Sequence, residues 1–360
     1  MFESFGFESL TPVQASLYLA LALGVAFGVL AEITRFCLRR ALVSADQSER
    51  RAAGGVWLMA LTVALIGTQA GVSAGLINFD AHRFLASDLP VLAIVLGGLA
   101  FGAGMVLTRG CASRLAVLTG SGNLRAGFVL VLFAIAAHAT LKGVLAPLSA
   151  ALASVTLPLG SFTSLAALPG GALPYTGGLA LTFFALALRS GASWRNLALA
   201  VLIGLIVPAA WLGTGYVLYD EFDPIVAESL SLTAPATATL FWAIASTSIA
   251  PGFGVGIVGG ILAGAAVSAL AFKRFAWVSF ESPAQTGRYT LGAILMGVGG
   301  VLAGGCTLGA GLSGIPTLGF SAFLALAAII AGAKIAGRVL NESGSGSVAQ
   351  PSTQALQPAE

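Results

Sequence analysis

Long apolar segments, separated by short polar connections, divide this sequence from end to end. A helix needs about 20 consecutive apolar residues to cross the hydrocarbon core of a bilayer. The segments that meet or approach this length lie at about residues 13–34, 54–77, 90–108, 126–146, 168–188, 196–217, 250–272, 290–305 and 317–338. In lipid, backbone groups must be satisfied within the spanning element. The pattern therefore predicts an all-α polytopic membrane protein with about nine transmembrane helices.

The composition excludes several other classes of protein. Hydrophobic residues make up 57% of the chain and charged residues only 9%, against about 25% charged residues in soluble domains. A soluble enzyme, a disordered chain and a nucleic-acid-binding module are all excluded, and the lipid bilayer is the expected surrounding. The opening MFESFGFESL carries no basic residue, so we do not expect a cleavable signal peptide.

Basic residues alternate along the connections and predict the orientation. The first, third, fifth and seventh connections carry two or more Arg or Lys, whereas the second carries only Arg83 and the other even ones carry none. Basic connections stay on the cytoplasmic side. We therefore expect a bacterial inner-membrane protein with a periplasmic N-terminus and a cytoplasmic C-terminus. Residues 1–338 would form one membrane domain, and the polar residues 339–360 a disordered cytoplasmic tail.

Two stretches of the chain resemble each other. FGAGMVLTRGC (101–111) aligns with MGVGGVLAGGC (296–306), which places Cys111 on Cys306. In the predicted orientation the two stretches run in opposite directions across the membrane. Two inverted halves, about 13–146 and 196–338, would then be linked by the helix at 168–188. Inverted repeats with interrupted helices are typical of transporters whose sites lie near the midplane, although a repeat can also serve packing alone.

Glycine predicts where helices break. The segment GGCTLGAGLSG (304–314) would be costly as a continuous helix, because each interior glycine costs about 1 kcal/mol relative to alanine. A turn between two half-helices would leave free N–H groups that can hold an anion. The segment at 236–249 is too short to cross and is expected to be a re-entrant or interfacial piece. The candidate anion-binding residues at the two aligned breaks are Gly110, Arg109, Arg114, Gly305, Thr307 and Gly309.

The cysteines Cys37, Cys111 and Cys306 are far apart in sequence and form no Cys-x-x-Cys motif. A disulfide framework and a zinc site are therefore not expected, and neither a cofactor nor a catalytic residue is predicted. Apolar surroundings favour the neutral thiol, which could contact a soft, sulfur-bearing anion weakly enough to let it move on. The alternative is that each cysteine is a small buried hydrophobe.

The sequence resembles the YeeE/YedE family of sulfur-compound transporters over residues 13–338. The resemblance rests on the segments TRFC, TRGCASR and GGCTLGAGLSG and on ESLSLTAP (228–235). It implies an hourglass-shaped permease, not an enzyme, with short helices that point into its middle. Thiosulfate would pass along Cys37, Cys111 and Cys306 by transient S–H···S contacts. It also implies a small TusA-like cytosolic sulfur carrier as a partner.

Other polar residues and other functions remain open. Lys142 and Lys334 occupy matching positions in the two halves, where they could snorkel to the headgroups or attract an anion at each mouth. Glu32 and Arg35 are three residues apart and are expected to pair. The alternatives to thiosulfate uptake are transport of another sulfur or selenium species and a membrane thiol-based sulfur transfer. For sulfur transfer the spacing supplies no local resolving cysteine.

Overall fold

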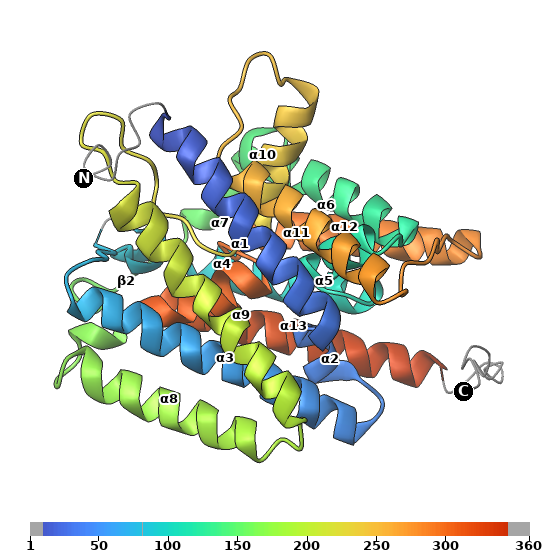
Figure 1. Cartoon of the computed structure of the whole chain (residues 1–360), viewed down its shortest axis with the longest axis horizontal. Helices are drawn as coiled ribbons and strands as arrows, with labels where there is room; N and C mark the ends of the chain where they lie inside the picture. Colours follow the sequence, from blue (N-terminus) through green and yellow to red (C-terminus); the bar gives the residue numbers. More distant parts are fainter. Residues whose placement is uncertain (1–9, 81, 345–360) are drawn as a thin grey trace.

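The computed structural model describes residues 10–80 and 82–344, and long helices dominate them (Figure 1). Eight helical segments are long and apolar enough to cross a membrane. The long helices are α1 (Pro12–Thr34), α3 (Gln47–Ser73), α4 (Val91–Leu107), α6 (Leu124–Lys142), α9 (Trp194–Leu212), α11 (Phe253–Ala271), α12 (Pro283–Leu302) and α13 (Phe320–Gly344). This confirms the predicted all-α polytopic membrane fold.

The helix α8 (Ala172–Leu188) has only 17 residues, about 25 Å at 1.5 Å per residue. It lies beside α3 and runs along most of its length (Figure 1). The start of α1 and the end of α13 lie on opposite sides of the molecule, as an odd number of crossings would place them. The segment predicted as the fifth span, 168–188, is α8, which is shorter than the eight helical segments that are long enough to cross.

Short elements lie between the long helices. The helices are α2 (Leu38–Val43), α5 (Ala112–Gly120), α7 (Ala146–Ala153), α10 (Thr233–Ile244) and the π-helical η5 (Thr307–Gly314), with short helical turns η2 (Arg83–Leu85), η3 (Leu165–Ala167), η4 (Gly213–Val217) and η6 (Ile315–Thr317). The strands β1 (Asp88–Leu89) and β2 (Leu157–Pro158) pair antiparallel. The segment expected to be a re-entrant or interfacial piece at 236–249 is the short helix α10.

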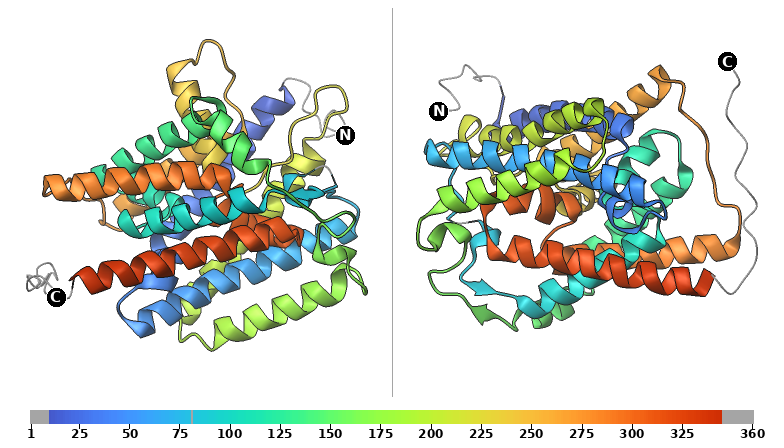
Figure 2. Two further views of the ribbon diagram at one scale, coloured as in Figure 1. Left: turned by 180° about the vertical axis from the view of Figure 1, so that it is seen from behind. Right: turned by 90° about the horizontal axis from the view of Figure 1, so that it is seen from below.

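Three predicted boundaries are wrong by six or more residues: α3 begins at Gln47 instead of residue 54, and the other two belong to α12 and α13. The eighth span was expected at 290–305, but α12 begins at Pro283, where the Ser282 side chain accepts a hydrogen bond from the Gln285 N–H. The polar residues of the first turns of α12 resemble a connection in composition, and the predicted span therefore begins seven residues too late. At the other end, α13 runs across the molecule (Figure 2) and continues to Gly344 instead of ending at residue 338. The remainder of the expected tail, 345–360, lies outside the described residues.

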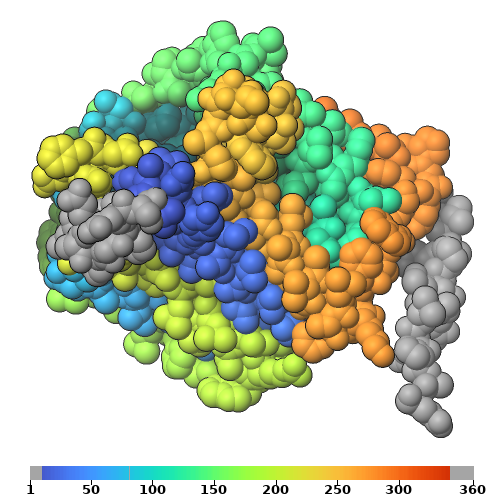
Figure 3. Space-filling model, turned by 45° about the horizontal axis from the view of Figure 1, so that its top comes forward, coloured from blue at the N-terminus to red at the C-terminus, as the bar shows by residue number. Residues whose placement is uncertain are grey.

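The glycine excess produces close helix contacts. The helices α1 and α11 lie side by side on one face (Figure 3). A Cβ added at Gly24 would lie 2.7 Å from the carbonyl oxygen of Ile257, and one at Gly28 would lie 2.5 Å from that of Ile261. Neither position can accept a side chain without separating the helices. Such small-residue contacts replace the hydrophobic driving force that is absent between helices in lipid.

The contact between α4 and α12 is reciprocal. The sequence alignment pairs Gly97 with Gly292 and Gly104 with Gly299. In the structure Gly97 lies against Gly299, and Gly104 lies against Gly292. A residue that touches the equivalent of its partner is the pattern expected around a two-fold axis. This observation supports the predicted inverted repeat.

Candidate functional site

Each of the three cysteines stands immediately before a short helix. Cys37 precedes α2, Cys111 precedes α5 and Cys306 precedes η5. The preceding long helices α1, α4 and α12 end only three or four residues earlier. The structure therefore has the helix breaks expected at Cys111 and Cys306, and it adds a third at Cys37. Sequence analysis expected no break at Cys37, which lies three residues beyond the first predicted span at 13–34.

The three breaks share one backbone device. The residue two positions before each cysteine has a positive φ: 53° at Arg35, 59° at Arg109 and 72° at Gly304. In the first two, the next N–H donates back five residues, from Phe36 to Ala31 and from Gly110 to Met105, both at 3.1 Å. This is the Schellman ending of a helix. A helix end in this form turns the chain sharply and delivers the cysteine to the start of the next helix.

Cys37 and Cys111 form a close pair. Their sulfur atoms are 3.8 Å apart, and the Ser113 hydroxyl lies 3.3 Å from the Cys111 sulfur. Both cysteines are buried, with 7% and 1% of their surface exposed. Residues 74 positions apart in sequence thus present two thiols and a hydroxyl to one point.

Cys306 lies in a break made almost entirely of backbone. Its side chain is fully buried, and its sulfur accepts a hydrogen bond from the Gly309 N–H at 3.4 Å. A Cβ at Gly305 would lie 2.8 Å from the Ala310 nitrogen, and one at Gly309 would lie 2.7 Å from the Ser231 hydroxyl oxygen. Thr307, also buried, begins η5. The glycines are therefore required by close approach around the thiol.

The order of the crossings places the cysteines on two sides. Cys37 and Cys111 follow α1 and α4, which run toward the side where α13 ends. Cys306 follows α12, which runs toward the side where α1 begins. The short helices α5 and η5 contact each other, and all three cysteines belong to one buried cluster. The two sets of breaks thus converge inside the protein.

The expected cationic residues differ in their surroundings. Arg114 donates from Nη1 to the Ala31 carbonyl at 3.5 Å and belongs to α5, three residues after Cys111. Arg109 is exposed at the left-handed position.

Glu32 was expected to pair with Arg35, but it has other partners. Its carboxylate accepts a hydrogen bond from Ser268 at 2.9 Å and pairs with Arg274 at 3.3 Å. The expected Glu32–Arg35 pair is wrong, because Arg35 lies beyond the helix in the left-handed turn.

A cavity of about 320 Å³ opens beside the Cys306 break. We name it the Arg83 cavity; its walls include His82, Arg83, Glu228, Ser231, Gly309 and Ser313. Ser313 donates to the Leu230 carbonyl at 2.7 Å, which ties η5 to the segment 228–235. The Ser231 hydroxyl is buried without a hydrogen-bond partner among the described residues. Sequence analysis did not identify this group, although ESLSLTAP contributed to the family resemblance.

The charged groups of the Arg83 cavity are partly desolvated. Burial raises the pKa of Glu228, and the nearby Arg83 partly offsets this. Burial also lowers the pKa of Arg83, although its side chain remains accessible from the cavity. Burial, together with the charge of Arg83, lowers the pKa of His82 to about 4. Near neutral pH, His82 is therefore uncharged, and Arg83 is the cation of this cavity.

A larger cavity of about 550 Å³ adjoins the first. We name it the Lys142 cavity; it is lined by His138 and Lys142 of α6, Phe253 of α11 and residues of α10, and Glu228 borders both cavities. Both lysines are exposed, but Lys142 ends α6 and lines this space, whereas Lys334 lies on α13, ten residues before its end. The two lysines matched in sequence thus have different surroundings.

Comparison with known proteins places these features in a family. The family model described as sulphur transport matches residues 33–335. The thiosulfate transporter TsuA of Escherichia coli strain K12 is 28% identical over 323 residues, which cover 80% of this chain and 84% of that relative. The thiosulfate transporter TsuA of Spirochaeta thermophila is 26% identical over 324 residues, covering 86% and 94%. The matched region includes all three cysteine breaks, and the chain belongs to the sulphur-transport family.

Proposed function

We propose that this membrane transporter carries thiosulfate from the periplasm to the cytoplasm across the bacterial inner membrane. The anion would arrive in the Arg83 cavity, contact Cys306 and then pass to Cys111 and Cys37. Both relatives are named thiosulfate transporters. The observation that carries the proposal is the repeated placement of a cysteine at the start of a short helix, with helices approaching from both sides.

Neutral thiols suit this path better than fixed charges. An S–H group is a weak donor and its sulfur a weak acceptor, so each contact with the terminal sulfur of thiosulfate is easily exchanged for the next. The 3.8 Å separation of Cys37 and Cys111 allows such an exchange without a large movement. Conduction requires contacts that are strong enough to admit the anion and weak enough to release it.

The cationic residues would guide the dianion at both ends. Arg83 lies in the cavity beside Cys306, and Arg114 lies beside the other two thiols, with Arg109 at the same break. The backbone at Gly110, Gly305, Thr307 and Gly309 would hold the anion as it passes. Lys142, and Lys334 on the opposite half, would raise the local anion concentration at the mouths.

The direction of transport needs a driving force. A dianion that enters against an inside-negative potential meets about 2.3 kcal/mol per charge per 100 mV. Removal of thiosulfate by a TusA-like sulfur carrier on the cytoplasmic face would draw the anion inward. The basic connections around Arg39 and Arg40 would lie on that face and could receive an acidic partner.

The test is thiosulfate uptake by a sulfur-auxotrophic bacterial host that lacks its own importers. Cys111→Ala and Cys306→Ala should each abolish growth on thiosulfate at equal membrane levels of protein. Val117→Ala is the matched control, because it removes buried methyl groups from the same short helix α5. No uptake by the unaltered protein would indicate another sulfur or selenium species. Uptake that survives both cysteine changes would show that the thiols only fill space.

The close pair of thiols also supports a second candidate, thiol-based sulfur transfer. The structure supplies the resolving partner that the sequence spacing did not. A Cys111 thiolate would attack the terminal sulfur of thiosulfate, forming a persulfide and releasing sulfite; the Cys37 thiol would then displace hydrosulfide and leave a disulfide. Release of sulfite in step with uptake by the purified, reconstituted protein would establish this route. Intact thiosulfate inside the vesicles would establish transport.

A further inference from the structure

We propose that Glu228 is a proton-binding site coupled to the anion, so that thiosulfate and one proton bind together in the cavities beside Cys306. The inference rests on the proposed function, and it names the coupling ion. It is carried by the position of one carboxylate between two cavities, with a single arginine within electrostatic reach.

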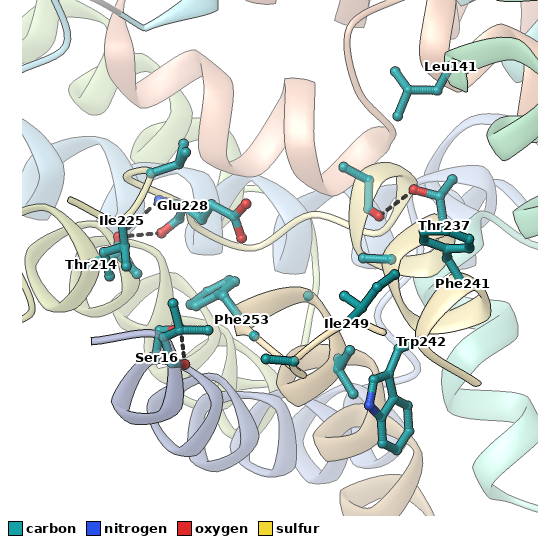
Figure 4. Close-up of a pocket in the computed structure, with 18 of the residues that line it drawn as sticks. Ser16, Leu141, Thr214, Ile225, Glu228, Thr237, Phe241, Trp242, Ile249 and Phe253 are labelled. Carbon is teal, nitrogen blue, oxygen red and sulfur yellow. Dashed lines mark hydrogen bonds between the residues drawn. The ribbon is translucent and has the colours of Figure 1, made fainter. Parts of the chain in front are cut away.

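The backbone of Glu228 is held firmly. Its N–H donates to the Thr214 hydroxyl at 3.0 Å, and that hydroxyl lies 2.8 Å from the Glu228 carbonyl oxygen. In Figure 4 the carboxylate points away from Thr214 and into the Lys142 cavity. The residue also lines the Arg83 cavity. A fixed backbone thus presents an acid to the space where an incoming anion would collect.

The carboxylate itself is not paired. Within residues 10–80 and 82–344, the hydrogen bonds of Glu228 are those of its backbone, and no carboxylate lies within ion-pair distance of Arg83. Arg83 nevertheless attracts the charge of Glu228. Partial burial with an incomplete counter-charge holds the pKa of Glu228 above its ordinary value.

The neighbouring titratable groups do not replace Glu228 in this role. Arg83 and His82 share the Arg83 cavity, and His138 and Lys142 share the Lys142 cavity. His82 is already neutral, since burial and Arg83 lower its pKa to about 4. His138 stacks on Phe241 with 5.3 Å between the ring centroids. Arg83 and Lys142 are cations that attract the anion and oppose uptake of a further positive charge.

The anion and the ionised carboxylate compete for Arg83. A dianion beside Arg83 repels an ionised Glu228 and also offsets the attraction between Arg83 and that carboxylate. The carboxylate therefore binds a proton from the water in the cavity: COO⁻ + H⁺ → COOH. No bond forms to the anion and no electron moves. By reciprocity, a protonated Glu228 binds the anion more tightly. The net charge of the bound pair is then one negative instead of two.

The test is thiosulfate binding to the full-length protein in detergent between pH 5 and pH 8. Above the pKa of Glu228 the affinity should fall by up to about tenfold per pH unit, the limit for one linked proton. Calorimetry in two buffers of different ionisation enthalpy should give uptake of close to one proton per anion. Glu228→Gln should keep tight binding and lose both the pH dependence and the proton uptake.

The control is Glu221→Gln, which neutralises an exposed acid in the same connection and should leave the wild-type pH dependence unchanged. If Glu228→Gln fails to fold, the number of protons that the wild-type protein takes up per bound thiosulfate still tests the inference. Tight binding with no proton uptake, or a proton uptake that persists in Glu228→Gln, would overturn the inference and leave thiosulfate transport standing. No thiosulfate binding at any pH would instead overturn the proposed function.

Discussion

The Cys111 and Cys306 segments use the same backbone turn with different residues at its strained position. The left-handed residue is Arg109 in one and Gly304 in the other, with φ values of 59° and 72°. Glycine adopts this conformation freely, whereas another residue there costs roughly 1 kcal/mol or more. We propose that an arginine occupies this position despite the cost because its charge is used. Strain of this kind persists mainly at functional sites.

The two segments also obtain their positive charge differently. Beside Cys111 the charge is local, from Arg109 and Arg114 in the same segment. Beside Cys306 the segment itself carries no charge, and Arg83 is supplied by the connection between α3 and α4. The comparison teaches that the two segments share the turn and the thiol, while their positive charges come from different parts of the chain.

Oxidation should separate the two segments most strongly. Copper phenanthroline applied to proteoliposomes should join Cys37 to Cys111, whose sulfurs are 3.8 Å apart, and abolish thiosulfate uptake. Cys306, which follows a helix that runs in the opposite direction to α1 and α4, should remain a free thiol. Mass spectrometry of alkylated peptides identifies the bond, and Cys37→Ser should prevent it. A disulfide between Cys111 and Cys306 would contradict the separation of Cys306 from the pair formed by Cys37 and Cys111.

Removal of the two arginines should have the next largest effect. Arg83→Gln removes the cation of the Arg83 cavity, so the KM for thiosulfate should rise about tenfold or more, as charged hydrogen bonds contribute about 1.5–3 kcal/mol. Arg114→Gln acts beside the inner thiols and should lower the maximal rate instead. Uptake kinetics in proteoliposomes measure both constants. Equal effects on KM from both changes would place the arginines at one site.

Substitution at the left-handed position tests why an arginine is present. Arg109→Gly should raise the free energy of unfolding by about 1 kcal/mol, because glycine relieves the turn. Uptake should nevertheless fall severalfold, because the charge is lost. Thermal unfolding in detergent and uptake at equal expression measure the two effects. Gly304→Ala is the counterpart, and it should lower stability. Full uptake by Arg109→Gly would show that the charge has no role.

The smallest effect is expected from the two buried acids. Glu32→Gln breaks the contacts with Ser268 and Arg274 and should lower the Tm by about 2–4 °C for each kcal/mol lost. Glu228→Gln should raise the Tm at pH 8, because ionisation of a group with a raised folded-state pKa costs stability above that pKa. The gain should vanish near pH 4, where Glu228 is protonated in both states. A lower Tm for Glu228→Gln at pH 8 would indicate that another group stabilises the ionised Glu228 carboxylate.

The sequence predicted the crossings well because their signal is local. Nearly every apolar segment from 13–34 to 317–338 overlaps a long helix, since bilayer thickness fixes helix length. Helix breaks at Cys111 and Cys306 were also readable, because glycine is costly in a helix interior. The polar first turn of α12 was missed because composition does not reveal a cap that begins a helix in polar residues.

The pairings were not readable in the same way. Cys37 meets Cys111 across 74 residues, and Glu32 meets Arg274 across 242. Periodicity reports which face of a helix is apolar, but it does not report which helix covers that face. The Arg83 cavity was missed for the same reason, since Arg83 and Glu228 come from separate connections, and the segment ESLSLTAP (228–235) does not reveal which connection it meets.

The buried thiols have a consequence for the energy of the cell. Cys111 and Cys306 lie at 1% and 0% exposure, and the cavity beside Cys37 holds only about 30 Å³. A water molecule needs about 10–15 Å³ of such space, so this cavity holds at most a few water molecules. If the buried thiols interrupt the water between the two sides, we expect a membrane crowded with this protein to stay electrically insulating. Chloride and free protons would be retained behind the same residues that admit a sulfur anion.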